Sequence, residues 1–102
     1  MKIVAVNTFG GSGYEFRPVR IPEGPWGFDY IKLLHDLPNF LIEVEPPDLI
    51  TGCYKVDGVF EDISKGVGVM FNLTKCNPTD EARVRAFVKG MVLTGFPYKY
   101  LY

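Results

Sequence analysis

The sequence contains few of the residue types from which metal and catalytic sites are usually built. It has one histidine, His35, and two cysteines, Cys53 and Cys76, with no C-x-x-C pair. These residues are too few for an ordinary zinc site, so we expect neither a metal nor a cofactor. We interpret the two thiols as reduced packing residues. A structural disulfide is the alternative, and it requires an oxidising compartment.

The sequence also lacks long apolar runs and a strong charge of either sign. No stretch approaches the ~20 apolar residues that cross a bilayer, and residues 1–8 do not resemble a secretion signal. We therefore expect an intracellular, cytoplasmic protein without membrane contact. The net charge of −1 provides no overall attraction to nucleic acid. Charge is nevertheless uneven, because residues 39–66 carry two basic and six acidic side chains, whereas residues 67–102 carry five and two.

The 102 residues, 47% of them hydrophobic, suit a single domain spanning 1–102. The pattern predicts strands and two amphipathic helices. Strands are expected at 2–6, 14–21, 39–45, 49–56, 59–63, 67–73 and 98–102, and helices at 25–37 and 78–94. The Asp57-Gly58 dipeptide is expected to form the tip of a hairpin between two of the strands. In the first helix, Trp26, Tyr30, Leu33, Leu34 and Leu37 are expected to share the buried face.

The second helix has the clearest sequence signals. Asn77 is the expected N-cap, Pro78 takes the first helical position, and acidic residues follow in the first turn. Five residues form an apolar stripe that should face the sheet: Val84, Phe87, Val88, Met91 and Val92. Phe87 lies centrally in this stripe, so truncating it to alanine is expected to cost roughly 3–5 kcal/mol.

These elements predict an α+β fold with a mainly antiparallel sheet of 4–6 strands. The simplest way to bury both amphipathic helices is to pack them on one face of that sheet. A ferredoxin-like arrangement, built on a split βαβ unit, is the leading specific topology.

Three groups of residues outside the final helix have both an ordinary and a functional interpretation. The loop Gly10–Gly13 follows a strand but matches no phosphate-binding spacing, so a hairpin loop is favoured over anion or nucleotide binding. His35 is expected to end the first helix, where a protonated imidazole is favourable. Catalysis by Cys53 or Ser12 would need His35 beside it, and no sequence feature indicates this. A solvated face is favoured over cation binding or acid–base chemistry for the acidic residues, which match no EF-hand spacing: Glu43, Glu45, Asp48, Asp57, Glu61 and Asp62.

The final helix carries a less ordinary strip opposite its apolar stripe. The strip consists of Ala82, Ala86, Gly90 and Leu93, and it is flanked by Arg83, Arg85 and Lys89. Glycine inside a helix costs about 0.5–1 kcal/mol relative to alanine, and close approach of another backbone would explain its presence. We take these seven residues as the candidate binding site. An exposed helix with small surface residues is the alternative interpretation.

The hypothesis from the sequence is therefore a non-enzymatic interaction module that binds a protein partner and associates with a second copy of itself. A nucleic-acid-binding protein is the second hypothesis. It would use the basic residues of the final helix, with Lys75, Lys99 and the tyrosines of the tail. A small enzyme or nucleotide binder using the Gly10–Gly13 loop is the third.

Overall fold

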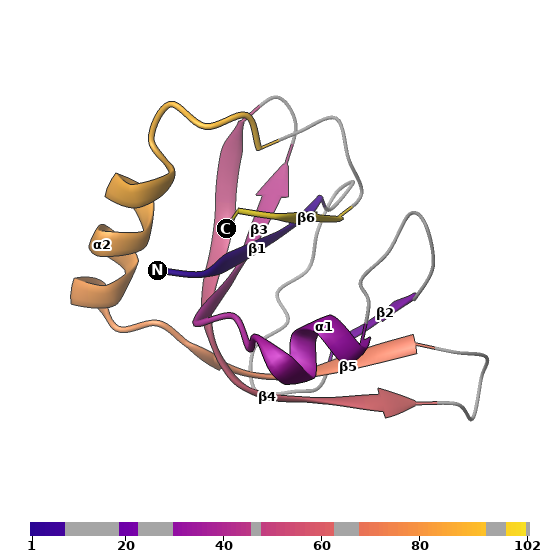
Figure 1. Ribbon diagram of the computed structural model, residues 1–102. Coiled ribbons are helices and arrows are strands. Elements are labelled where there is room, and N and C mark those ends of the chain that lie inside the picture. Colours follow the sequence, from indigo (N-terminus) through magenta and orange to yellow (C-terminus); the bar gives the residue numbers. More distant parts are fainter. Residues whose placement is uncertain (8–18, 23–29, 46–47, 63–67, 94–97, 102) are drawn as a thin grey trace.

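A computed structural model of the chain describes residues 1–7, 19–22, 30–45, 48–62, 68–93 and 98–101. The elements, in chain order, are β1 (Ile3–Asn7), β2 (Val19–Pro22), α1 (Tyr30–His35), β3 (Phe40–Glu45), β4 (Leu49–Asp62), β5 (Gly68–Lys75), α2 (Pro78–Val88) and β6 (Tyr98–Tyr100) (Figure 1). Within these ranges neither helix is long and apolar enough to cross a lipid bilayer.

All six strands belong to one sheet, in the order β2-β5-β4-β3-β1-β6. β1 and β3 are parallel, and the other four neighbouring pairs are antiparallel. The predicted α+β class and mainly antiparallel sheet are confirmed, as is the short edge strand in the tail. The ferredoxin-like variant is not the observed topology, because the parallel strands β1 and β3 are direct neighbours, whereas a split βαβ unit places another strand between them.

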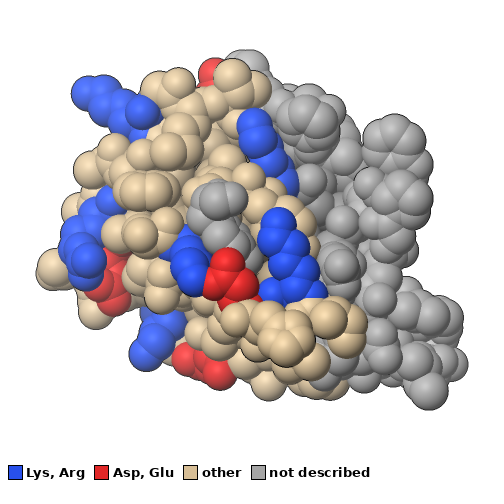
Figure 2. Space-filling view, in the orientation of Figure 1, with Lys and Arg blue, Asp and Glu red and all other residues tan. Residues whose placement is uncertain are grey.

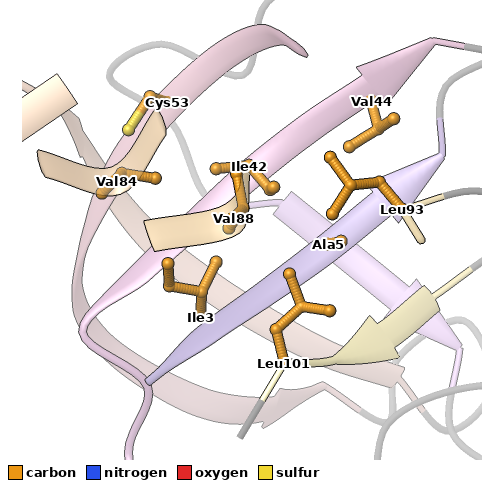
Figure 3. Close-up of a cluster of buried hydrophobic side chains, with 9 residues drawn as sticks. All are labelled: Ile3, Ala5, Ile42, Val44, Cys53, Val84, Val88, Leu93 and Leu101. Carbon is orange, nitrogen blue, oxygen red and sulfur yellow. The ribbon is translucent and has the colours of Figure 1, made fainter. Parts of the chain in front are cut away.

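The buried side chains form two clusters. The α1-side cluster comprises Val4, Val6, Leu33, Leu41, Tyr54, Val56, Phe71 and Leu73. The α2-side cluster comprises Ile3, Ala5, Ile42, Val44, Cys53, Val84, Val88, Leu93 and Leu101 (Figure 3). Successive residues of β1 and β3 alternate between the clusters, and successive strand residues point to opposite faces. The two clusters therefore lie on opposite faces of the sheet.

The two helices therefore lie on opposite faces of the sheet. α1 contributes Leu33 to one cluster, and α2 contributes Val84 and Val88 to the other. The expectation of a single shared face is not met in this detail. The physical reason is that β1 is apolar on both faces and β3 carries a buried apolar residue on each, so both faces need a cover.

β4 is longer than expected and bends between two partners. Residues 49–55 pair with β3, and residues 54–62 pair with β5. Backbone bonds from Cys76 to Cys53 and from Val56 to Asn39 extend the overlap, so that residues 53–56 are bonded on both sides. The predicted hairpin at Asp57-Gly58 is wrong, because the dipeptide lies inside β4 at an irregularity in the register between Val56 and Gly58. Pairing with β5 on both sides of the dipeptide outweighs its local turn preference and leaves a β-bulge.

α1 is short, and its described side chains bury less than predicted. Leu33 is fully buried, but Leu34 and Leu37 are 51% and 40% exposed, so these two do not belong to the buried face. The predicted start of this helix, including Trp26, lies outside the described residues. His35 ends the helix, as predicted, and is exposed.

Candidate interaction surface

α2 begins as the sequence predicts and ends earlier. Asn77 caps it, and its Oδ1 accepts a hydrogen bond from the Asp80 N–H at 2.8 Å. The helix ends at Val88, and Gly90 follows with φ +84°, a conformation that L residues rarely adopt. The Met91 N–H donates to the Val88 carbonyl at 3.0 Å and closes this turn. The predicted continuation to residue 94 is therefore wrong.

The early end of α2 changes the apolar stripe. Val84 and Val88 are buried at 0% and 2% exposure, but Phe87, Met91 and Val92 are 38%, 39% and 65% exposed. Met91 and Val92 lie after the helix, so its periodicity no longer directs them toward the sheet. Phe87 lies at the edge of a narrow contact made by two valines. The prediction that all five residues face the sheet is wrong for these three.

The seven predicted site residues do not form one strip. Ala82, Arg83, Ala86, Arg85, Lys89 and Gly90 are exposed, but Leu93 is 4% exposed and belongs to the α2-side cluster (Figure 3). Gly90 lies beyond the helix, and its positive φ explains the glycine without a second backbone. Arg85, Lys89, Gly90 and Leu93 come together elsewhere, at a groove, whereas Ala82, Arg83 and Ala86 lie outside it.

This α2-end groove is an open depression of about 660 Å³ between the end of α2 and the start of β4. It is lined by Asp48, Ile50, Arg85, Val88, Lys89, Gly90, Met91, Val92 and Leu93. Val88 and Leu93 are its buried side chains, and Met91 and Val92 are its exposed apolar ones. Sequence reasoning assigned Met91 and Val92 to the core. Gly90, read as a helix terminator, is the signal that would have placed them at the surface.

Charged groups of both signs surround the groove and the adjoining helix. Figure 2 shows basic side chains spread over the α2 side of the molecule, with uncharged side chains between them. Arg85 Nη2 lies 3.2 Å from Glu81 Oε1 and 3.4 Å from the Ile50 carbonyl oxygen, so this cation is held within the fold. No ion pair joins Lys89 to the described residues, and Asp48, across the groove, is exposed.

The acidic residues behave in two ways. Asp48 is exposed as predicted, and the exposed Asp57 accepts a hydrogen bond from the Thr74 hydroxyl. Glu43, however, is only 2% exposed, and its Oε1 accepts a hydrogen bond from the Tyr54 hydroxyl at 3.3 Å. The prediction of a solvated Glu43 is wrong. Leu41 on the same face of β3 was the available signal that this face is buried.

The remaining candidates come from other parts of the chain. The Gly10–Gly13 loop and Ser12 lie outside the described residues, as do the side chains of Glu61 and Asp62. In the part of the chain that the structure describes, no three His, Cys, Asp or Glu side chains are grouped so as to hold a metal ion.

No protein-family model, curated protein or solved structure matches this chain.

Proposed function

We propose that the chain is a non-enzymatic interaction module that associates with a second copy of itself through the α2-end groove. The observation that carries this proposal is the groove itself, in which exposed apolar side chains lie beside buried ones. Val92 and Met91 are 65% and 39% exposed, while Val88 and Leu93 next to them are buried. An apolar centre with a charged rim is the usual composition of a protein interface.

The charges of the rim favour a second copy as the occupant. A two-fold interface brings the same surface of both copies together. If one residue of the first copy contacts a second residue of its partner, the symmetry repeats that contact with the two copies exchanged. The groove carries an acid, Asp48, and a cation with no ion pair to the described residues, Lys89. Under a two-fold axis, each Asp48 can meet the Lys89 of the other copy, which fixes the orientation of the pair.

Nucleic acid is a weaker candidate because several of the required cations are used within the fold. Arg83 lies 3.6 Å from Asp80, and Arg85 lies 3.2 Å from Glu81. Lys99 donates to the Val92 carbonyl at 2.9 Å. Tyr100 is half-buried beneath the ammonium group of Lys32, 4.0 Å from the ring centroid, so it is not a free stacking platform.

Sedimentation velocity over a concentration series tests the proposal. The wild-type protein should dimerise, and Val92→Glu should raise the dimer dissociation constant at least ~10-fold, because it places a charge in the apolar centre. Leu34→Glu is the matched control, since Leu34 is 51% exposed and lies on α1, on the other face of the sheet. This control should dimerise as the wild type does.

A charge exchange tests the two-fold arrangement. Asp48→Lys and Lys89→Asp should each weaken the dimer, and the double variant should restore it. A wild-type protein that stays monomeric at high concentration would refute self-association. Equal weakening by Val92→Glu and Leu34→Glu would refute this groove as the interface. Salt-dependent binding of a single-stranded oligonucleotide by the monomer would favour the nucleic-acid hypothesis instead.

A further inference from the structure

Two thiols that are distant in sequence meet at the base of α2. Cys53 lies in β4, and Cys76 lies between the end of β5 and Asn77, the N-cap of α2. The Cys53 thiol donates to Cys76 Sγ at a distance of 3.1 Å, and the Cys76 N–H donates to the Cys53 carbonyl at 3.1 Å. Both cysteines are free in the structure.

The strand register holds this pair in place. Tyr54 and Lys75 are cross-strand partners, and the backbone bond between the cysteines continues the same ladder by one residue. The sulfur atoms need to approach by only about 1 Å to reach the length of a disulfide bond. The β4–β5 ladder therefore brings the two sulfurs together without any change of fold.

A bond at this position would act on α2. Cys53 belongs to the same buried cluster as Val84 and Val88 (Figure 3). Those two valines are the buried side chains of the helix, so α2 is held by a narrow apolar contact. A covalent link at its N-terminal end would add a second point of attachment.

We propose that Cys53 and Cys76 form a reversible disulfide that fastens α2 to β4, with a glutathione-type disulfide as the oxidant. Cys76, which is partly exposed, reacts first: its thiolate attacks one sulfur of the oxidant, forms a mixed disulfide and releases one glutathione thiolate. The Cys53 thiolate then attacks the Cys76 sulfur and expels the second glutathione. Two protein thiols are oxidised, one disulfide is reduced, and the two protein protons pass to the released glutathione thiolates.

The environment of the sulfurs sets the pace of this reaction. Burial is the main cause that raises the pKa of the Cys53 thiol, with a further contribution from its contact with Cys76. Burial also raises the pKa of Cys76. Thiols with raised pKa values react slowly with alkylating agents at neutral pH, because the thiolate is the nucleophile. The pair should therefore be slow toward iodoacetamide, while its proximity favours the intramolecular step.

The test uses the native protein incubated in glutathione buffers of increasing oxidised fraction, followed by acid trapping and intact mass measurement. The wild type should lose two hydrogen atoms without retaining glutathione, and digestion should recover a peptide that links residues 53 and 76. The oxidised protein should melt at a higher temperature than the reduced protein, and dithiothreitol should reverse both changes. Cys76→Ser should form no internal link.

Three results would overturn the proposal. The first is stable glutathione adducts or disulfide-linked dimers in place of an internal bond. The second is an internal bond that forms only when the wild type is first unfolded in denaturant. The third is an internal bond that leaves the melting temperature unchanged or lowers it. Circular dichroism of Cys76→Ser, and of Cys76→Ala as a second variant, verifies that the controls are folded.

Discussion

At the scale of single residues, Gly52 shows how a missing side chain makes room for a buried polar contact. A Cβ atom built at Gly52 would lie 2.6 Å from Glu43 Oε1, and 2.7 Å and 2.8 Å from the ring and hydroxyl of Tyr54. These separations are shorter than real contacts allow. Glu43 and Tyr54 can therefore form their hydrogen bond only because residue 52 is glycine.

We predict that Gly52→Ala lowers the free energy of unfolding by about 1–3 kcal/mol, because the added methyl group overfills this space. Gly58→Ala is the control in the same strand, since its Cβ would find only Asn72 Nδ2, at 4.0 Å. That control should be neutral or slightly stabilising. Urea denaturation of both variants measures the difference, and an equal loss at the two positions would contradict the assignment.

The burial of Glu43 was beyond sequence reasoning for a physical reason. Alternation along β3 correctly separates Phe40, Ile42 and Val44 from Leu41 and Glu43. Alternation does not say whether the second face is covered, because that depends on a helix and strands that lie elsewhere in the sequence. A glutamate such as Glu43, which has no basic residue near it in sequence, is expected to be solvated.

At the scale of elements, local sequence signals determine where α2 begins but not where it ends. Its N-terminal cap follows from residues within one turn, and the structure confirms it. Its C-terminal end depends on which of two glycines, Gly90 or Gly95, adopts the terminating conformation. The structure uses Gly90, with φ +84°. That choice exposes Met91 and Val92 and creates the α2-end groove, so the candidate site could not be located from helical periodicity.

The packing of α2 leads to a revised stability prediction. Phe87 is 38% exposed, so Phe87→Ala should cost about 1 kcal/mol, well below the 3–5 kcal/mol expected from a central position in the stripe. Val84 is fully buried between α2 and the sheet, so Val84→Ala should cost about 2 kcal/mol although it removes fewer atoms. Chemical denaturation measures which of the two variants loses more free energy of unfolding. A larger loss for Phe87→Ala would place the buried face of α2 where the sequence first indicated.

At the scale of the whole molecule, the continuous apolar run of residues 3–6 in β1 was the signal for a sheet covered on both faces. A strand with one solvated face alternates apolar and polar residues, whereas β1 carries Ile3 and Ala5 on one face and Val4 and Val6 on the other. The class of the fold could be predicted from its elements. The order of the strands could not, because β1 pairs with β3 from the middle of the sequence and with β6 from its far end.

The course of β4 has a consequence for how the molecule opens. Since only residues 53–56 of β4 are bonded on both sides, the sheet consists of two halves that are joined through this short stretch. Segments joined by so short an overlap can open as separate cooperative units. We expect β2, β5 and the second half of β4 to form one such unit, and β1 and β3 to remain closed when it opens.

Native-state hydrogen exchange makes this visible. Amides of β5 that bond to β2 and to the second half of β4 should exchange about tenfold faster than those between β1 and β3, and they should share one opening free energy. Lys55→Pro, which removes an amide at the overlap, should increase this difference in exchange rate. If every strand amide exchanged with the same free energy, the two halves of the sheet would open as one unit, and the short overlap in β4 would not weaken the fold.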